Sequence, residues 1–362
     1  MGSYWKGRTV FVTGATGLMG GWVVKALLRD GAEIVALVRD YAPKSMVVRE
    51  GVIERIATLP GDLESLPTMQ RAIADYEPHT VFHLAAQPLV QVAKRDPVGT
   101  LRANVMGTWN VMEACRLAGT SNVIVASSDK AYGASKTLPY RETHPLQGQY
   151  PYDVSKSCTD LIAQMYAATY GVKTAIARCG NLFGGGDLNF SRTLPGLIKA
   201  TLANKRFVIR SDGKFVRDFL YVKDAAECYL TLGERLAEDE SISGEAFNFS
   251  LGERLTVLDI VNMTLKIMGR IDLEPVIRTW QPPKFASSIW TRARRGKGSA
   301  GGHGMAWKKR SGKPWTGIES TSQPRRQRHR RRSNAGSLRR WRREPLVGHM
   351  LEPRQVDASH KQ

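Results

Sequence analysis

The stretch "VFVTGATGLMGGWVV", residues 10–24, decides the fold of this 362-residue chain. It opens with the apolar run of a buried strand and closes with the apolar spacing of a helix. Between the two, Gly14, Gly17 and Gly20 follow a GxxGxxG spacing. Glycine permits a tight turn and a close backbone approach, so the first turn of the helix can face a pyrophosphate. We therefore predict a dinucleotide-binding loop formed by Gly14, Thr16, Gly17, Leu18, Met19 and Gly20.

Strand and helix patterns alternate from this loop to about residue 180. The predicted strands are 8–14, 33–40, 80–86, 122–128 and 173–180, and the predicted helices are 18–31, 68–78, 96–119 and 152–171. Continuously apolar strands separated by helices indicate a parallel sheet that is covered on both faces. The fold class that we predict is therefore α/β, a doubly wound parallel sheet of the Rossmann type.

Beyond Gly180 the pattern becomes less regular and suggests a second unit. Its predicted elements are helices at 193–205, 222–237 and 256–269 and strands at 207–210 and 245–250. We predict an NAD(P)-binding Rossmann domain over 1–180 with part of 215–245, a smaller and discontinuous α/β substrate domain over 181–277, and a non-globular, disordered basic tail over 278–362.

Composition favours a cytoplasmic protein. No segment reaches the roughly 18 apolar residues of a membrane span, and the opening "MGSYWKGRTV" has no signal-peptide core. The cysteines are scattered and form neither a CxxC pair nor a Cys/His cluster with zinc spacing. They are Cys115, Cys158, Cys179 and Cys228. We expect reduced core cysteines and no metal site.

Most of the charge lies in the tail. The chain has a formal net charge of +20, and residues 278–362 contain 22 Lys and Arg residues against four acidic ones. The first 277 residues are therefore nearly neutral, which argues against a nucleic-acid-binding surface on the folded part. A genuine Arg-rich arm that neutralises phosphates, or a disordered tail without a partner, stays an alternative for the tail itself.

A change of reading frame would explain the composition of the tail. Apolar periodicity stops after Ile277, and five of the eight tryptophans follow it. When the possible codons are read from their third base, "MAWKKRSGKPWTGIEST" can encode "MEEALGKTVDWYREY", an amphipathic helical pattern. Because Trp has one codon, Trp followed by Thr must give Asp and Trp followed by Lys must give Glu. We therefore expect that a frameshift replaced the native C-terminus.

Two strand ends are placed to meet an adenosine. Arg39 and Asp40 end the second strand, where an acid holds a ribose hydroxyl and an Arg favours a 2′-phosphate. They point to different cofactors, so NAD and NADP both stay open. Asp62, followed by Leu63, ends the presumed third strand, where its carboxylate can accept a hydrogen bond from adenine. Capping of the loop is the alternative role of Asp62.

Two further segments carry polar residues that suit chemistry. "ASSDKAYG", residues 126–133, ends an apolar strand with a serine, an acid and a base in succession. "YDVSK" places Tyr152 and Lys156 four residues apart and so on one face of a helix. A lysine ammonium beside a phenol favours phenolate, so we expect Lys156 to lower the pKa of Tyr152.

Over residues 5 to about 277 the chain resembles the extended short-chain dehydrogenase/reductase family, in its nucleotide-sugar branch. The resemblance rests on "TGATGLMG", "GDLES", "HLAAQ", "NVMGT", "SSDKAYG", "YDVSK", "RCGNLFGGG" and "RDFLYVKD". Within that branch the chain is most similar to the CDP-glucose 4,6-dehydratases, above all in "SDK". The resemblance implies a nucleotide-sugar substrate bound by 181–277, NAD or NADP as cofactor, and a homodimer.

The resemblance also implies a reaction that turns an NDP-hexose into its 4-keto-6-deoxy form. Tyr152, as phenolate, takes the proton of the sugar 4-hydroxyl while a hydride leaves carbon 4, and Lys156 holds the nicotinamide ribose. Asp129 protonates the departing 6-hydroxyl, and Lys130 occupies the position of the base at carbon 5. Ser128 hydrogen-bonds the 4-oxygen. The hydride then returns to carbon 6.

The remaining binding residues follow from the same resemblance. Asn181 of "GNLFG" and Arg217 of "RDFLYV" contact the pyrophosphate and nucleotide of the substrate. The segment "HLAAQ" lines the cofactor through Leu84, Ala85, Ala86 and Gln87. Its His83 is expected to be a packed core histidine rather than a catalyst. Asn104 lies on the helix that pairs subunits and supports the site.

Several functions stay open. The segment "RDFLYVKDAAECY" is shared with epimerases and other dehydratases, so GDP-mannose and other hexoses remain candidate substrates. A 4-epimerase or reductase of the same family is the first alternative. A cofactor-binding protein with a nucleic-acid-binding tail is the alternative of another class. The altered C-terminus is expected to expose apolar surface and to compromise activity.

Overall fold

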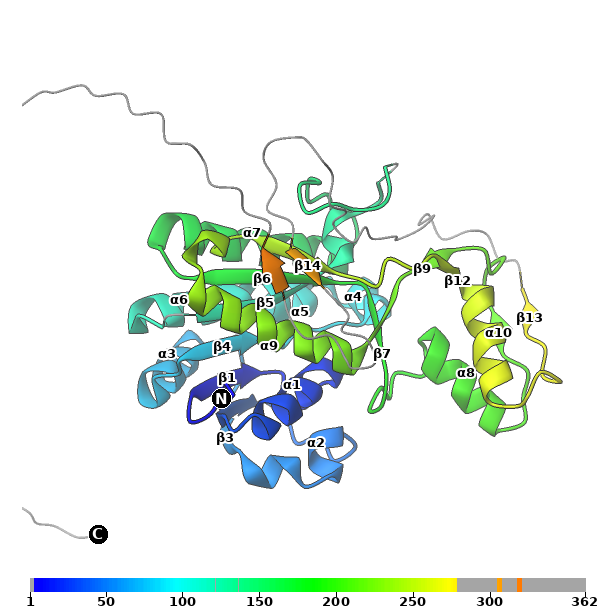
Figure 1. The fold of residues 1–362 in the computed structure, drawn as a ribbon, viewed down its shortest axis with the longest axis horizontal. Coiled ribbons are helices and arrows are strands. Elements are labelled where there is room, and N and C mark those ends of the chain that lie inside the picture. Colours follow the sequence, from blue (N-terminus) through cyan, green and yellow to red (C-terminus); the bar gives the residue numbers. More distant parts are fainter. Residues whose placement is uncertain (1–2, 121, 136, 279–304, 308–317, 321–362) are drawn as a thin grey trace, which may run out of the picture. The chain divides into compact units, whose positions relative to one another are not determined.

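The structure, a computed structural model, describes residues 3–120, 122–135, 137–278, 305–307 and 318–320. Seven parallel strands form its main sheet in the order β11-β6-β5-β4-β1-β2-β3 (Figure 1). They are β1 (Thr9–Thr13), β2 (Glu33–Val38), β3 (Ala57–Pro60), β4 (Thr80–His83), β5 (Asn122–Ser128), β6 (Thr174–Cys179) and β11 (Ala246–Phe249). The predicted doubly wound Rossmann sheet is confirmed.

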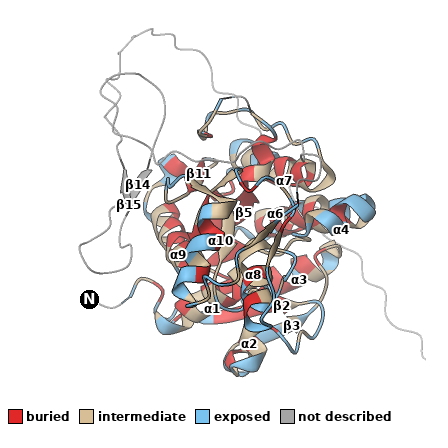
Figure 2. Ribbon diagram, turned by 90° about the vertical axis from the view of Figure 1, so that its right-hand side faces the viewer, coloured by how far each residue is buried: buried red, intermediate tan, exposed pale blue. Residues whose placement is uncertain are grey.

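Helices cover both faces of this sheet, because its strands carry apolar side chains on both sides. One face is covered by α1 (Leu18–Arg29) and α9 (Val222–Glu238), and the other by α3 (Leu66–Tyr76), α6 (Gly107–Ala118) and α7 (Pro151–Tyr170). Successive side chains of a strand point to opposite faces. In β1, Val10 and Val12 therefore pack with α1 and α9, whereas Phe11 packs with the other layer. Figure 2 shows these inner surfaces in red.

The helix predicted at 96–119 is interrupted in the structure. It consists of α5 (Pro97–Leu101), a π-helical turn η2 (Arg102–Met106) and α6. Asp96 caps the start of α5 by accepting a hydrogen bond from the Gly99 amide at 2.8 Å. The wider turn carries Asn104, which is buried and contacts the site described below. Such single π-helical turns are frequent at functional sites.

A smaller part follows β6 in the sequence. It contains β7 (Asn181–Phe183), α8 (Thr193–Leu202), β8 (Val208–Ile209), β9 (Val216–Arg217), β10 (Phe219–Tyr221), β12 (Leu255–Thr256), α10 (Val257–Ile267) and β13 (Val276–Ile277). Its strands pair two by two, as β7 with β10, β8 with β13 and β9 with β12. Leu197, Ile209, Val261 and Leu265 form its small core between α8 and α10.

Strand β11 belongs to the main sheet, where it pairs with β6, whereas we had placed residues 245–250 in the smaller domain. Its short apolar run does not reveal which partner it joins, since strand pairing is decided by contacts distant in sequence. The domain boundaries themselves stay a prediction. The predicted basic tail lies outside the described residues, apart from Arg278 and the antiparallel pair β14 (Met305–Trp307) and β15 (Ile318–Ser320).

The remaining described elements are short. They are α2 (Met46–Arg49), α4 (Val90–Arg95), η1 (Val52–Arg55), η3 (Asp129–Tyr132) and η4 (Glu240–Ile242). Within the described part of the chain, no helix combines the length and the apolar character that crossing a membrane requires.

Candidate active site

The predicted site residues gather at one edge of the main sheet. Because its strands are parallel, their carboxyl ends meet at the same edge, which is where ligands bind in such folds. β1 pairs with β4, and β4 pairs with β5. The glycine loop after β1, the "LAAQ" segment after β4 and the "SDK" segment at the end of β5 are therefore adjacent.

The glycine loop fits a pyrophosphate. Gly14 has a φ of +76°, and a Cβ there would lie 2.7 Å from the amide nitrogen of Ala85. A Cβ at Gly20 would lie 2.0 Å from the carbonyl oxygen of Gly14. Only glycine suits these two positions. Helix α1 begins at Leu18, after Thr16 and Gly17, without a capping side chain, so its first N–H groups can bind an anion.

The expected adenosine contacts are exposed or used within the protein. Arg39 and Asp40 are both exposed and form an ion pair with each other, with Nε and Oδ2 2.6 Å apart. Oδ1 of Asp62 accepts a hydrogen bond from the Glu64 amide at 3.0 Å, which is the alternative capping role. Leu63 is buried, and its carbonyl accepts a hydrogen bond from Asn110 at 2.7 Å. These contacts leave the preference between NAD and NADP undecided.

His83 is a packed core histidine, as predicted. It is buried between Thr13, whose Oγ1 lies 2.9 Å from Nδ1, and Thr108, whose Oγ1 lies 3.1 Å from Nε2. Burial lowers the pKa of His83 to about 3, so the ring is neutral near pH 7. Thr13 Oγ1 also accepts hydrogen bonds from the amides of Leu84 and Ala85. The histidine thus fixes the backbone beside the glycine loop.

Asn104 links the loop after β4 to α7. The amide of Gln87, next to Ala86, donates to Oδ1 of Asn104 at 2.7 Å, and Nδ2 of Asn104 donates to Ser155 Oγ at 2.9 Å. Ser155 lies between Tyr152 and Lys156 in the sequence. Asn104 therefore supports the site, as expected, by setting the position of α7 against the "LAAQ" segment.

Ser128, Asp129 and Lys130 contact one another at the end of β5. Ser128 Oγ donates to Asp129 Oδ1 at 3.0 Å, and Lys130 Nζ donates to Asp129 Oδ2 at 2.8 Å. The side chain of Asp129 is 4% exposed and that of Lys130 is 30% exposed. If Asp129 and Lys130 were only the polar end of a strand, water would surround both side chains. This pair is instead largely buried, which raises the strength of its interactions.

Tyr152 lies in the first turn of α7, beside Ser128. Burial raises the pKa of Tyr152 well above its ordinary value, and the negative charge of Asp129 raises it further. A hydrogen bond with Ser128 lowers this pKa but does not offset the burial. The expectation that Lys156 lowers this pKa is not met, because Lys156 Nζ donates to the carbonyl of Ala126 at 2.8 Å. Burial lowers the pKa of Lys156 to about 8, although the negative charge of Asp160 acts in the opposite direction. The two side chains nevertheless share one face of α7, as predicted.

Sequence reasoning missed two buried carboxyl groups near Asp129. Burial raises the pKa of Asp153 to about 6, against the charge of Lys130, and Asp153 Oδ2 has no hydrogen-bond partner among the described residues. Burial also raises the pKa of Asp218 to about 6, against Ser250. Asp153 follows Tyr152 and Asp218 follows Arg217 in the sequence, so adjacency to predicted residues was the available signal.

The two predicted substrate-binding residues lie on strands of two different sheets, β7 and β9. Asn181 opens β7, and its Nδ2 donates to the carbonyl of Asp218 at 3.2 Å. Arg217 ends β9, its guanidinium lies 5.2 Å from the centre of the Phe215 ring, and burial lowers its pKa. The negative charge of Asp129 opposes this lowering of the Arg217 pKa, so the guanidinium lies near the Asp129 carboxylate.

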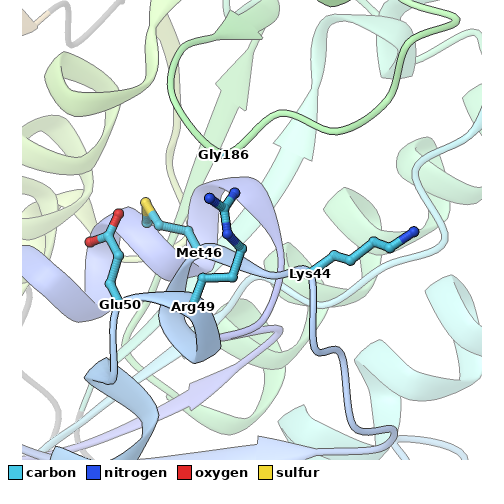
Figure 3. A pocket seen from close by; sticks show the side chains of 5 residues that line it. All are labelled: Lys44, Met46, Arg49, Glu50 and Gly186. Carbon is cyan, nitrogen blue, oxygen red and sulfur yellow. The ribbon is translucent and has the colours of Figure 1, made fainter.

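A small cavity of about 120 Å³ lies beside the glycine-loop helix. It is lined by Lys44, Met46, Arg49, Glu50 and Gly186. Figure 3 shows the guanidinium of Arg49 directed toward Gly186 and the ammonium of Lys44 directed away from it. A Cβ at Gly21 of α1 would lie 3.0 Å from Met46 Cε. The cavity therefore adjoins α1 and is separate from the group around Tyr152.

Known proteins of similar sequence and structure carry the same fold. The profile of the NAD dependent epimerase/dehydratase family matches residues 10–249. The CDP-glucose 4,6-dehydratase of Salmonella typhimurium is 32% identical over 263 residues, which cover 68% of this chain and 72% of that protein. The dTDP-glucose 4,6-dehydratase of Streptomyces antibioticus is 29% identical over 266 residues, covering 72% and 77%.

Among solved structures, the UDP-glucose 4-epimerase of Thermotoga maritima with UDP-glucose is 26% identical. It superposes with a TM-score of 0.71 over 78% of this chain and 89% of that one. These matches confirm the predicted resemblance to the nucleotide-sugar branch, and the family description confirms the predicted NAD cofactor. From the matched residues, the relatives and the fold, this chain belongs to the NAD-dependent epimerase/dehydratase family.

Proposed function

We propose that this protein is a cytoplasmic nucleotide-sugar 4,6-dehydratase with CDP-glucose as its favoured substrate. The observation that carries the proposal is the buried contact of Asp129 with both Ser128 and Lys130, beside Tyr152. Oxidation at carbon 4 requires, besides the hydride acceptor, only a base such as the phenol and its neighbours. An acid and a base at the same place are required when water must also be eliminated.

The first task of the site is to remove the proton of the 4-hydroxyl. Tyr152 takes this proton as phenolate, and the positive end of the α7 dipole, in whose first turn it lies, partly offsets the burial that raises its pKa. Lys156 adds a buried positive charge on the same helix face and holds the nicotinamide ribose. The glycine loop would hold NAD, which would supply the acceptor for the hydride from carbon 4 and its return to carbon 6.

The second task is elimination. A ketone at carbon 4 makes the carbon 5 proton acidic, and Lys130 as free amine removes it. Asp129 as carboxylic acid protonates the 6-hydroxyl, which leaves as water. Arg217 suits the substrate pyrophosphate, since a guanidinium binds phosphate oxygens in a bidentate manner. Asn181, on β7, completes the proposed nucleotide contacts.

The choice of CDP-glucose rests on two supports. The Salmonella relative at 32% identity is a CDP-glucose 4,6-dehydratase, and the Asp-Lys order of "SDK" is typical of that type. A 4-epimerase of the same family is the second candidate, because the Thermotoga epimerase shares the fold over 89% of its length. Epimerases of the family usually lack the acid and base after Ser128.

A product assay separates the two functions. The purified chain is incubated with NAD and, separately, with CDP-glucose, dTDP-glucose, UDP-glucose and GDP-mannose. A dehydratase forms a 4-keto-6-deoxy sugar, which is detected by its absorbance after alkali. Formation of the 4-epimer without that absorbance would contradict the proposal and support the epimerase.

We also propose a homodimer built from the exposed faces of α6 and α7. Trp109, Leu117, Leu161 and Met165 are large apolar side chains exposed on these two adjacent helices. An apolar surface of this kind is typical of a subunit interface. Sedimentation of the purified chain should show a dimer, and Leu161→Glu should give a monomer. The exposed Leu202→Glu variant on α8 serves as its matched control, and dissociation by both variants would contradict this interface.

The tail is proposed to compromise activity. Leu202 on α8 is 77% exposed and Ile267 on α10 is 83% exposed, and the outer face of α10 is pale blue in Figure 2. The amphipathic segment encoded in the other frame suits such a face. A gene with the frame restored should give a higher turnover and a higher melting temperature than the 362-residue chain. Equal values for the two chains would contradict the proposal.

A further inference from the structure

Tyr132 ends η3, the helical turn that carries Asp129 and Lys130, and its side chain is buried. Its hydroxyl forms two hydrogen bonds with strands of the main sheet. It accepts one from Arg178 Nη1 on β6 at 2.7 Å and donates one to Asn248 Oδ1 on β11 at 2.8 Å. Burial raises the pKa of Tyr132 to about 12, so the phenol keeps its proton near pH 7. A side chain outside the proposed chemistry thus fastens the turn that carries two of its groups.

Arg178 connects this turn to α7. Its guanidinium forms two hydrogen bonds with Asp160, at 2.7 and 2.8 Å, and both side chains are almost completely buried. Asp160 lies on α7, the helix that carries Tyr152 and Lys156. The path from Tyr132 through Arg178 to α7 therefore consists of short hydrogen bonds between buried groups.

Asn248 is held in the orientation that the Tyr132 hydroxyl requires. Its Nδ2 donates to the carbonyl of Tyr140 at 3.3 Å, and its backbone amide donates to Glu142 Oε1 at 3.0 Å, so Oδ1 accepts from Tyr132. The rings of Tyr132 and Tyr140 are stacked, with their centroids 4.8 Å apart and an interplanar angle of 12°. Because stacked rings tolerate an offset, the two hydrogen bonds of the hydroxyl fix the position of the Tyr132 ring.

The proposed dehydration uses groups from two segments. Oxidation at carbon 4 uses Tyr152 and Lys156 of α7, whereas elimination uses Asp129 and Lys130 of η3. We propose that Tyr132 is a positioning residue for elimination, whose hydroxyl sets the place of η3 against α7 and so holds Asp129 and Lys130 at carbons 6 and 5 of the oxidised sugar. This inference rests on the proposed dehydratase function. Tyr132 itself exchanges no proton in the reaction.

Tyr132→Phe removes the hydroxyl and keeps the stacked ring. Asn248 Oδ1 then loses this donor, whereas Arg178 Nη1 keeps the carbonyl of Glu142 at 3.0 Å. η3 has four residues and α7 has 20, so the loss of one side-chain contact displaces the turn more readily than the helix. A displacement of about 1 Å can slow a reaction about 100-fold. Elimination should therefore slow about 10- to 100-fold, and oxidation less than about threefold.

A single turnover separates the two steps. The absorbance of the reduced nicotinamide rises during oxidation and decays when the hydride returns after elimination. Tyr132→Phe should leave the rise nearly unchanged and slow the decay about 10- to 100-fold. Asp129→Asn, which lacks the acid for elimination, is the reference and should show the same pattern. A merely structural role would change both rates alike, so equal changes in the rise and the decay would overturn the proposal.

Tyr166→Phe is the matched control. Tyr166 is a buried tyrosine of α7, and its hydroxyl donates to Glu113 Oε2 at 3.1 Å. This variant should change both rates less than about threefold, and a decay slowed as much as in Tyr132→Phe would overturn the proposal. Asn248→Leu is a second variant in case Tyr132→Phe does not fold. It removes the acceptor of the Tyr132 hydroxyl and should also slow the decay more than the rise.

A measurement without substrate separates this inference from the proposed function. The amide of Gly133 donates to the carbonyl of Lys130 at 3.0 Å, so its hydrogen exchange reports the opening of η3. Tyr132→Phe should speed this exchange at least about tenfold, and Tyr166→Phe less than about threefold. Unchanged exchange in Tyr132→Phe would overturn the positioning role. Faster exchange in a protein that forms no 4-keto sugar would instead reject the dehydratase and support Tyr132 as the residue that holds η3.

Discussion

Two acid–base pairs lie close together in this molecule and differ in how many hydrogen bonds they form and in how deeply they are buried. Arg178 on β6 and Asp160 on α7 form two hydrogen bonds of 2.7 and 2.8 Å, with side chains 3% and 0% exposed. Arg178 also donates to Tyr132 Oη at 2.7 Å. Asp129 and Lys130 form a single hydrogen bond of 2.8 Å, and Lys130 is partly exposed.

The difference separates a pair that supports the fold from a pair that can react. The guanidinium of Arg178 is enclosed and bonded to Asp160, Tyr132 and the carbonyl of Glu142, so the pair ties β6 and α7 to the segment between β5 and α7. Lys130 Nζ contacts Asp129 at 2.8 Å and its side chain is 30% exposed, so it remains accessible to a substrate. A pair whose hydrogen-bonding groups are not all used can exchange protons and bind substrate. A pair whose groups are all used has no hydrogen-bonding capacity left.

The largest effect is expected on activity at the incomplete pair. Asp129→Asn keeps the shape of the side chain and removes its ability to donate an acidic proton, so dehydration should fall by up to about 10⁴-fold, equivalent to about 5 kcal/mol. The rate of 4-keto-6-deoxy product formation measures it, with thermal unfolding as the control for folding. Dehydration retained within about threefold of the unsubstituted chain would reject the acid role.

The next effect is on stability at the completed pair. Arg178→Met leaves the Asp160 carboxylate buried without its partner, which should lower the free energy of unfolding by about 3–5 kcal/mol. Denaturant unfolding followed by fluorescence measures this loss. The double variant Arg178→Met/Asp160→Leu is the matched control, because removing both charges should recover much of it. A loss below about 1 kcal/mol for the single variant would show that the pair is not structural.

A smaller effect of opposite sign is expected at Asp153, beside the incomplete pair. Burial raises the folded-state pKa of Asp153 to about 6, above its ordinary unfolded value of about 3.9. The folded state therefore binds more protons between these values, and stability falls as the pH rises from about 4 to about 6. At pH 8, Asp153→Asn should be more stable than the unsubstituted chain by about 1–2 kcal/mol.

Unfolding of Asp153→Asn and the unsubstituted chain is therefore compared at pH 4, 6 and 8. The stability difference should be small at pH 4 and should grow up to pH 8. Asp75→Asn, at an exposed position on α3, is the matched control and should show no such trend. A difference independent of pH would contradict the assignment to the Asp153 carboxyl.

The smallest effect is expected at an exposed pair. Arg235 and Glu238 lie three residues apart on α9 with Nη1 and Oε2 3.1 Å apart, and both side chains are well exposed. Glu238→Gln should change the free energy of unfolding by less than about 0.5 kcal/mol, since solvent and salt screen such pairs. The same denaturant titration measures it. If Glu238→Gln lowered the free energy of unfolding as much as Arg178→Met does, burial would not explain why the pairs differ.

Much of the fold and part of the site could be predicted from local patterns. The apolar runs predicted β1, β2, β4, β5 and β6, and the glycine spacing predicted the loop whose residues 14 and 20 have no room for a Cβ. Strand β3 has no apolar run and was only presumed to end before Asp62. The four-residue spacing placed Tyr152 and Lys156 on one face of α7. The membership of β11 in the main sheet depends on pairing with β6, which lies about 70 residues away.

The sequence by itself determined which elements form and that Ser128, Asp129 and Lys130 leave β5 together, because periodicity and adjacency are local properties of the chain. Only the tertiary structure decided that Asp129 is buried, that Tyr152 lies near both Ser128 and Asp129, and that Asp153 and Asp218 lie near Asp129. It likewise directed Lys156 to the Ala126 carbonyl. Burial of the phenol, which the tertiary structure also decides, raises the pKa of Tyr152. Desolvation and hydrogen bonding depend on what other elements place around a group, and no local pattern contains that information.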